Sequence, residues 1–374
     1  MPKYAIVHEW FDSYAGSERC VESFNNLYPD ADVFAIANFL TDEEQLQILK
    51  GKSPKTSFIQ NVPFSKKIFR SLLPLFPYAI EQFDLSAYDI IISSTHAVAK
   101  GVLNNSNQLH IAYCHTPMRY AWDLYFQYMK EAKLEKGIKA FFVKRFLHNI
   151  RIWDVISANR VDYFIANSKY VAQRINKVYR RDADVIYPPV DVDKFPLCEK
   201  KENYYLTASR LVSYKKVDVI VKAFSTMRDK KLIVIGDGPE MNNLKKIASP
   251  NIEFLGYQSG NILVEMMQKA KAFVFAANED FGITVVEALS CGTPVIAPGY
   301  GGTAETVIHK ENGIHFNEQN EKSLKEAINE FEKNIDTFNP QNISESATKF
   351  SRNRFEKEIN EYVNSKYNDF LNRT

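Results

Sequence analysis

Short apolar runs alternate with amphipathic segments along this chain, and that alternation constrains the fold more than any other feature. Helical patterns such as Val217–Met227 and Glu321–Ile335 separate the runs. Strands that alternate with helices form parallel sheets covered by helices on both faces. The pattern occurs in both halves, so we predict two doubly wound α/β domains. The strand-like runs are YAIVHEW, DIIISSTH, HIAYCHT and DYFIANS in the first half, and NYYLTAS, KLIVIGDG, IEFLGY, AFVFAA and TPVIAPG in the second.

The boundary between the domains is predicted at Pro188 and Pro189, because consecutive prolines continue neither a sheet nor a helix. The chain of 374 residues also exceeds the usual size of a single hydrophobic core. We expect an N-terminal Rossmann-like domain over 1–188 and a C-terminal Rossmann-like domain over 189–351. Apolar residues at helical spacing over 352–374 predict a helix that packs back on the first domain.

The cysteines and the apolar runs of the sequence indicate in which cellular compartment we expect the protein. The four cysteines are scattered without a C-x-x-C pair, which is typical of reduced thiols and argues against a disulfide framework or a zinc site. The start, MPKYAIVHEWF, lacks the apolar stretch of a signal peptide. No run approaches the roughly 18 apolar residues of a membrane span. We expect a cytoplasmic protein with no metal site and no nucleic-acid partner.

Two glutamates flank a glycine in the segment ANEDFGITVVEALSCGTPV. Glu279 follows an apolar strand, and Gly282 leads into a helix that carries Glu287 and that Gly292 ends. Ligands of open α/β sheets bind beyond the carboxyl ends of the strands, and a helix start favours an anion such as a diphosphate. Glu279 could accept hydrogen bonds from sugar hydroxyls and Glu287 from a ribose. A surface carboxylate and a glutamate favoured by the helix dipole are the alternative.

Two cations, Arg210 and Lys215, follow the predicted strand NYYLTAS. Arginine can bind a diphosphate through two parallel hydrogen bonds, whereas lysine acts as a point charge. A solvated helix entry is the alternative. The nearby stretch GDGPE resembles part of a dinucleotide-binding loop, but Met241 stands where the third glycine is needed, so it is a weak NAD signal.

In the first domain, His115 follows the run HIAYC and could form a hydrogen bond at a reaction centre. Gly16 follows the first strand and could let the backbone approach a phosphate. A satisfied loop histidine and an ordinary turn glycine are the alternatives. The D-x-D pairs of the chain lie in loop or linker sequence, and we assign no metal to them.

Taken together, these segments resemble the GT-B glycosyltransferases of family 4, whose two facing domains enclose a donor cleft. The resemblance covers nearly the whole second domain, and the motifs stand in the family's order and spacing. They are SRLVSYKKVD, VIGDGPE, IEFLGY, NEDFGITVVEALSCGTPVIA, GYGGTAETV and ENGIHF. In the first domain, YAGSER and the strand-end His115 match as well. Within the family, PYAIEQFDLSAYDIIISSTHAVAKG and CHTPMRYAWDLY are similar to bacterial O-antigen mannosyltransferases of the WbaZ-like group.

The resemblance implies how a nucleotide-sugar donor is bound. Arg210 and Lys215 would hold the diphosphate and stabilise its departure, while Gly16 would contact the phosphate. Glu279 would hold the donor sugar and Glu287 the ribose.

Further contacts follow from the same resemblance. His115 would contact the sugar near its anomeric carbon and, with Glu279, make up the catalytic pair. Tyr257 would lie beside the base. The backbone amides of Phe281, Gly282 and Ile283 would bind sugar and phosphate.

The activity implied is that of a retaining hexosyltransferase that needs neither a metal nor a cofactor. It would move a hexose, with mannose from GDP-mannose favoured, onto a polyprenyl-diphosphate-linked glycan in O-antigen or capsular polysaccharide synthesis. The acceptor hydroxyl would attack on the face from which the diphosphate departs. Open alternatives are a UDP- or dTDP-sugar donor and a nucleotide-sugar epimerase or hydrolase of the same fold. An NAD-dependent oxidoreductase and a non-catalytic sugar-nucleotide-binding subunit are disfavoured.

The sequence departs from the family pattern at three loop positions. Lys216 replaces the usual glycine after the lysine, Ser209 replaces the glycine before the arginine, and Ala15 stands where the first of two loop glycines is common. Each departure puts the phosphate-loop geometry in doubt and leaves the charged residues in place.

Two tracts of the first domain, Thr56–Tyr78 and Lys130–Arg151, mix basic and aromatic side chains. This composition suits the interface of an anionic membrane, and the resemblance implies a lipid-linked acceptor. We therefore expect peripheral attachment to the inner face of the cytoplasmic membrane. An amphipathic helix with its aromatic side chains in the core is the alternative. The residues concerned are Phe58, Phe64, Lys66, Lys67, Phe69, Arg70 and Phe76 in the first tract and Lys136, Lys139, Phe141, Phe142, Lys144 and Arg145 in the second.

Overall fold

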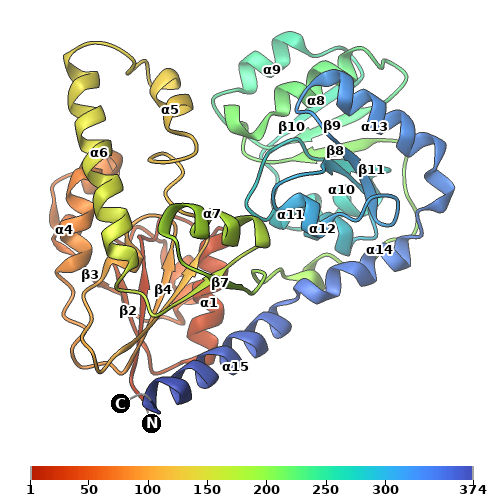
Figure 1. The fold of residues 1–374 in the computed structure, drawn as a ribbon. Coiled ribbons are helices and arrows are strands. Elements are labelled where there is room, and N and C mark those ends of the chain that lie inside the picture. Colours follow the sequence, from red (N-terminus) through yellow and green to blue (C-terminus); the bar gives the residue numbers. More distant parts are fainter. Residues whose placement is uncertain (1, 373–374) are drawn as a thin grey trace. The chain divides into compact units, whose positions relative to one another are not determined.

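The computed structural model describes residues 2–372, which form two compact units. Unit 1 comprises Met1–Pro188 together with Phe355–Thr374, and unit 2 comprises Pro189–Arg354. Each unit is an α/β structure built around one parallel sheet (Figure 1).

Unit 1 contains a seven-stranded sheet in the order β3-β2-β1-β4-β5-β6-β7, and every neighbouring pair is parallel. The strand order reverses between β1 and β4, which makes the gap beyond their carboxyl ends the natural ligand position of this sheet. The strands are β1 Tyr4–His8, β2 Asp32–Ala35, β3 Lys55–Thr56, β4 Ile90–Thr95, β5 Leu109–Cys114, β6 Tyr163–Ala166 and β7 Ala183–Val185.

The helices of unit 1 begin at polar caps in several places. Thr41 accepts a hydrogen bond from the Glu44 N–H in a capping box, and Ser168 accepts one from the Val171 N–H. The helices are α1 Gly16–Leu27, α2 Asp42–Leu49, α3 Ser65–Ile68, α4 Phe76–Glu81, α5 Tyr125–Glu131, α6 Ile138–Ala158, α7 Lys169–Tyr179 and α15 Arg352–Leu371, with short 3-10 helices at Phe58–Asn61, Phe69–Leu75 and Ala99–Gly101.

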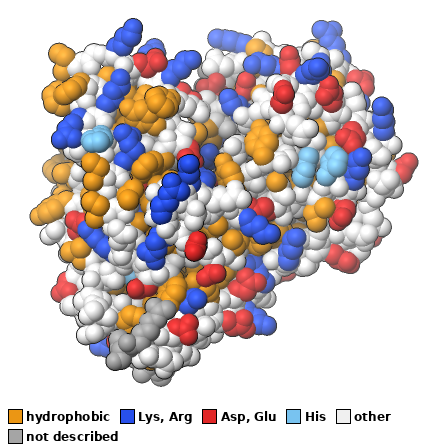
Figure 2. Space-filling view, in the orientation of Figure 1, with side chains coloured by type: hydrophobic (Ala, Val, Ile, Leu, Met, Phe, Trp, Pro, Cys, Tyr) orange, Lys and Arg blue, Asp and Glu red, His pale blue; other side chains and the backbone are white. Residues whose placement is uncertain are grey.

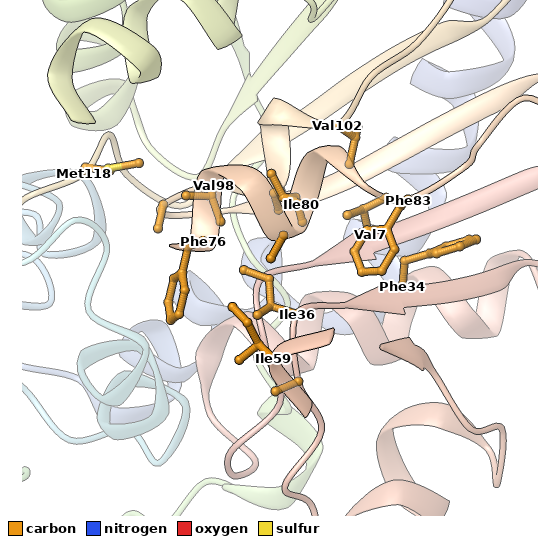
Figure 3. Packing of buried hydrophobic residues seen from close by; sticks show 14 of the residues in the cluster. Val7, Phe34, Ile36, Ile59, Phe76, Ile80, Phe83, Val98, Val102 and Met118 are labelled. Atoms are coloured by element: carbon orange, nitrogen blue, oxygen red, sulfur yellow. The ribbon is translucent and has the colours of Figure 1, made fainter. Parts of the chain in front are cut away.

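Both faces of the unit 1 sheet are covered by apolar side chains. On one face, Val7 and Phe34 from the strands belong to the same buried cluster as Phe76 and Ile80 from α4 (Figure 3). On the other face, Phe24 of α1 packs against Phe355 of α15, with ring centroids 5.9 Å apart. The last helix of the chain is therefore part of the core of unit 1.

Unit 2 contains a six-stranded parallel sheet in the order β10-β9-β8-β11-β12-β13. Here the order reverses between β8 and β11. The strands are β8 Tyr205–Ala208, β9 Leu232–Ile235, β10 Ile252–Gly256, β11 Ala272–Val274, β12 Val295–Pro298 and β13 Gly313–Phe316. The helices are α8 Val217–Ser225, α9 Met241–Ile247, α10 Gly260–Lys269, α11 Ile283–Ser290, α12 Thr303–Thr306, α13 Glu321–Lys333 and α14 Pro340–Ala347, with 3-10 helices at Val192–Lys194, Ser213–Lys215, Ile335–Thr337 and Thr348–Phe350.

The predicted fold class, two doubly wound parallel-sheet units, is confirmed. The strands β2, β3, β7 and β13 were not predicted. Across residues 2–372, no helix combines the length and the apolar character that crossing a bilayer requires.

Candidate functional site

The loops that follow β8 and β11 carry the charged residues singled out in unit 2. These two strands are neighbours in the sheet, and the strand order reverses between them. Arg210 and Lys215 follow β8, and Glu279 follows β11. Side chains that follow adjacent parallel strands emerge at the same edge of the sheet, at the position where such sheets bind ligands.

The structure joins two of these side chains directly. Lys215 Nζ lies 2.6 Å from Glu279 Oε1, and both side chains are only about one-fifth exposed. The rings of Tyr214 and Phe275 lie 5.7 and 6.0 Å from the same ammonium group. A pair that is partly shielded from water interacts more strongly than one on an open surface. The ion pair therefore fixes a cation and a carboxylate beside one another at the switch point.

The turn after Glu279 is held in place from several sides. Gly282 has φ 90° at the position that begins α11, a conformation that glycine adopts without strain. Phe281 is buried against Phe350, with ring centroids 5.4 Å apart. The Gly302 N–H donates to the Glu279 carbonyl at 2.8 Å. A Cβ atom at Gly302 would lie 2.4 Å from the Asp280 carbonyl oxygen, so that position admits only glycine without a shift of the turn.

The helix after this turn carries Ile283 at its first position and Glu287 one turn later. Residues four apart lie on the same face of a helix. Glu287 is 5 % exposed, so its carboxylate is shielded within unit 2. Gly292, with φ 70°, follows the last turn, as the sequence predicts for the end of this helix.

Backbone hydrogen bonds join the loop of Arg210 to the segment GDGPE, residues 236–240, and to the end of the strand before it. The Ser209 N–H donates to the Ile235 carbonyl at 3.1 Å, and the Leu211 N–H donates to the Asp237 carbonyl at 2.9 Å. Arg210 itself is exposed. The two loops that the sequence associates with a nucleotide are therefore adjacent along the edge of this sheet.

Tyr257 lies further away in the strand order. It follows β10, which is the edge strand and is separated from β8 by β9. Its side chain is 74 % exposed, so it is available for stacking.

In unit 1, the predicted residues Gly16 and His115 follow β1 and β5. Gly16 is the first residue of α1. His115 follows β5, and its Nε2 lies 2.8 Å from Ser94 Oγ. The same hydroxyl lies 3.2 Å from His8 Nδ1, and His8 Nε2 lies 3.2 Å from Glu18 Oε1. His115 is thus the outer end of a buried polar chain.

The surroundings of His115 favour its neutral form. Burial lowers the pKa of the imidazole well below its ordinary value of 6.5, and the neighbouring His96 and His8 lower it further. At neutral pH the ring therefore offers one N–H donor and one nitrogen acceptor.

A second carboxylate of unit 1 is buried at the same edge of the sheet. Glu9 accepts hydrogen bonds from the N–H groups of His96, Ala97 and Val98 at 2.7 to 2.9 Å and from the Thr95 hydroxyl. Burial alone would raise its pKa, but the electrostatic interaction with the His96 ring and the hydrogen bonds from the backbone amides outweigh burial, so the pKa is lowered. This carboxylate orients the loop after β4.

Sequence reasoning missed four polar residues of unit 1: His8, Glu9, Glu18 and Ser94. A signal exists for three of them, His8, Glu9 and Ser94, because His8-Glu9 and Ser93-Ser94 are polar residues within or directly after apolar strand runs. Buried polar groups require partners, so polar residues in such runs predict a hydrogen-bond network.

Comparison with known proteins gives the same architecture and two sequence families. Residues 30–194 match the model for Glycosyltransferase Family 4, and residues 191–353 match the model for Glycosyl transferases group 1. The Anabaena protein HepE, solved in complex with UDP, superimposes with a TM-score of 0.69 at 18% identity, over 97% of this chain and 100% of that one. The chain has the fold of a GT-B glycosyltransferase.

Curated relatives of this GT-B chain match parts of it. An uncharacterized glycosyltransferase of Methanocaldococcus jannaschii is 30% identical over 51% of this chain and 55% of its own length. A GDP-mannose-dependent alpha-(1-6)-phosphatidylinositol monomannoside mannosyltransferase of Mycobacterium tuberculosis is 29% identical over 39% of this chain and 46% of its own length. The chain spans about half of the length of the curated relatives it matches.

Proposed function

We propose that this protein is a retaining hexosyltransferase that uses a nucleotide sugar, with GDP-mannose the favoured donor. The observation that carries the proposal is the ion pair between Lys215 and Glu279 at the switch point of the unit 2 sheet. One partner is a cation suited to a diphosphate, and the other is a carboxylate suited to sugar hydroxyls. Because the two side chains are in contact, a group that would bind the diphosphate and a group that would bind the sugar lie at one position.

The leaving group in such a reaction is a nucleoside diphosphate, which gains negative charge as the glycosidic bond breaks. Arg210 and Lys215 would neutralise that charge, and the start of α11 would add its amide dipoles. The proposal needs no metal ion, because these groups supply the positive charge. The acceptor hydroxyl would attack on the face from which the diphosphate leaves, and the diphosphate would take its proton.

The similar proteins differ in the nucleotide with which they are named, so they do not agree on the base of the donor. The Mycobacterium tuberculosis relative is named for GDP-mannose, whereas HepE was solved with UDP. We retain GDP-mannose because of the resemblance of the first domain to O-antigen mannosyltransferases. A UDP- or dTDP-sugar is the second candidate.

The experiment is a thermal-shift panel of GDP-mannose, UDP-glucose, UDP-galactose and dTDP-glucose, followed by binding of the free nucleotides to variants. We expect GDP-mannose to stabilise the protein most. Lys215→Ala should weaken GDP binding by roughly 10- to 100-fold, the value of a charged hydrogen bond. Glu279→Ala should abolish sugar transfer and leave GDP binding intact, because it removes a sugar contact and frees Lys215 for the diphosphate.

A matched control comes from the neighbouring helix. Lys222 pairs with Asp218 at 3.0 Å on the exposed surface of α8, so Lys222→Ala removes an ion pair without touching the switch point. GDP binding should be unchanged in that variant. Equal losses in the Lys222 and Lys215 variants would contradict the proposal. A preference for UDP-sugars would change the proposed donor from GDP-mannose to a UDP-sugar and would leave the proposed site unchanged.

We further propose that the acceptor is a lipid-linked glycan and that unit 1 docks on an anionic membrane to reach it. Helix α6 carries three strongly exposed apolar side chains near its start: Ile138 at 80 %, Phe141 at 66 % and Phe142 at 66 %. Residues 137–153 contain no aspartate or glutamate. Figure 2 shows basic and hydrophobic side chains interspersed over this part of unit 1, at the upper left. Exposed aromatic rings among cations favour an anionic interface.

The first basic-aromatic tract supports this proposal only in part. Phe64 is 75 % exposed beside the exposed cations Lys66 and Lys67. By contrast, Phe69 and Phe76 are buried and pack around Trp10. The alternative of core aromatics therefore holds for these two rings, and the docking surface is built mainly on α6.

A further inference from the structure

Four polar side chains form a continuous chain across the switch point of the unit 1 sheet. His115 Nε2 lies 2.8 Å from Ser94 Oγ, Ser94 Oγ lies 3.2 Å from His8 Nδ1, and His8 Nε2 lies 3.2 Å from Glu18 Oε1. His8 and Ser94 are fully buried, and Glu18 is 6 % exposed. Each inner group therefore depends on the others for its hydrogen bonds.

The Glu18 carboxylate at one end of the chain accepts hydrogen bonds and does not donate any. Its Oε2 accepts from the Ala15 N–H at 3.2 Å and from the Ser17 hydroxyl at 2.9 Å. Burial would raise the pKa of this carboxyl, but the bonds to His8 and to the other donors outweigh burial, so the pKa is lowered. An ionised carboxylate has only acceptor sites. His8 must therefore place a proton on Nε2.

The direction of the remaining bonds follows one atom at a time. With its single proton on Nε2, a neutral His8 has Nδ1 as an acceptor, so the Ser94 hydroxyl donates to it. The Ser94 oxygen then accepts from His115, which requires the proton of His115 to be on Nε2. The other ring nitrogen of His115, Nδ1, carries the free lone pair, and none of residues 2–372 forms a hydrogen bond with it.

We propose that His8 and Ser94 are positioning residues that hold His115 in its Nε2–H tautomer, so that Nδ1 accepts a hydrogen bond from a hydroxyl group of the sugar substrate. An acceptor at this point repels a phosphate oxygen and attracts a hydroxyl, so it selects the chemical group that binds there. Only the identity of the hydroxyl rests on the proposed function. The tautomer is a property of the protein without substrate.

The alternative proton arrangement has the opposite consequence. If His8 were doubly protonated, its Nδ1–H would donate to Ser94, and the Ser94 hydroxyl would donate to His115 Nε2. His115 would then present an N–H donor at Nδ1. The two arrangements therefore predict opposite tautomers for the same ring, and spectroscopy separates them.

The test is nitrogen NMR of the whole 374-residue chain labelled with ¹⁵N-histidine. The chain contains seven imidazole rings. The His115 signals are assigned by their disappearance in His115→Asn. We expect the ¹⁵N shifts of the Nε2–H tautomer at neutral pH. Ser94→Ala should convert them to a mixture of tautomers, and Ser94→Thr, which keeps the hydroxyl, should restore them.

Ser93 provides a matched control on the same strand. It is buried like Ser94, but its hydroxyl lies 2.9 Å from Nε2 of His110. Ser93→Ala should therefore change the His110 signals and leave those of His115 unchanged. Unchanged His110 signals in Ser94→Ala show that this variant is folded.

Kinetics supply an independent measurement. Ser94→Ala should lower kcat/KM for sugar transfer by about tenfold, the effect of one misdirected hydrogen bond, with nucleotide binding unchanged. An Nδ1–H tautomer of His115 in the wild-type protein would overturn the inference. A His115 tautomer in Ser94→Ala that is unchanged from the wild type would overturn it as well. The expected tautomer together with no binding of any nucleotide sugar would instead overturn the proposed function.

Discussion

Lys216 adopts a left-handed backbone conformation, with φ 55° and ψ 31°, at the residue that precedes α8. This conformation costs a residue with a Cβ atom about 1 kcal/mol or more, whereas glycine adopts it freely. The glycosyltransferases that the sequence resembles usually have glycine at this place. The chain therefore carries backbone strain directly beside Lys215, in the loop of the proposed diphosphate site.

Replacing Lys216 by glycine should relieve this strain. We expect Lys216→Gly to raise the free energy of unfolding by up to about 1 kcal/mol, because the relief exceeds the entropy that glycine adds to the unfolded chain. Urea unfolding followed by circular dichroism measures the change. Lys222 lies within α8, in a right-handed conformation, and Lys222→Gly should lower the free energy of unfolding by about 1 kcal/mol. Destabilisation in both variants would show that the left-handed residue is not strained.

At the residue scale, the sequence indicates individual charges but not their partners. Lys215 and Glu279 were predicted because each follows a strand, whereas their ion pair depends on the adjacency of β8 and β11, which are separated by two strands in the sequence. The chain from His115 to Glu18 was not predicted for the same reason. It joins β1, β4 and the end of β5, and only the strand order brings these together.

At the scale of elements, helix α6 has both a buried face and strongly exposed apolar side chains. Its 21 residues include buried Leu147 and Ile150 on one face, while Phe141 and Phe142 lie exposed at the other end of the helix. The sequence predicted a basic-aromatic tract there, and periodicity alone could not decide between a buried and an exposed aromatic face. In the structure, Phe69 and Phe76 of the first tract are buried, whereas Phe141 and Phe142 of the second tract are exposed.

Removing the two exposed rings should weaken membrane binding without affecting the fold. We expect Phe141→Ser/Phe142→Ser to reduce flotation with phosphatidylglycerol vesicles by at least tenfold, because two aromatic rings no longer enter the interface. The wild-type protein should bind neutral phosphatidylcholine vesicles much more weakly. Ile262→Ser, an exposed apolar site on α10 of unit 2, is the control and should bind like the wild type. Binding by the double variant equal to the wild type would exclude α6 as the docking element.

At the scale of the whole molecule, several imidazoles are kept neutral by the fold. Burial lowers the pKa values of His96, His115 and His315, and it lowers that of His110 to about 4. An unfolded histidine titrates near 6.5 and binds a proton there, whereas the folded ring does not. These groups contribute stability that is fully present above pH 6.5 and is lost as the pH falls towards the folded pKa.

The acid sensitivity of the fold should therefore decrease when His110 is removed. A pKa of about 4 in place of 6.5 corresponds to roughly 3 kcal/mol of unfolding free energy lost between these pH values. His110→Gln should be less stable at pH 7 because its hydrogen bonds are altered, but its stability should fall less between pH 6.5 and 4. Denaturant unfolding at a series of pH values measures both quantities. His148→Gln, at an exposed site, is the control. If the free energy of unfolding of His110→Gln fell with pH as steeply as in the wild type and in this control, His110 would not be a source of the acid sensitivity.

The last helix has a consequence for how the protein is made. Phe355, Ile359 and Val363 of α15 complete the core of unit 1, yet they are synthesised after all of unit 2. At a usual elongation rate, the ribosome needs on the order of ten to thirty seconds to add the intervening residues. During this interval Phe24 and Tyr113 lack their contacts with the Phe355 ring. Until α15 has been made, nascent unit 1 therefore lacks one part of its apolar core.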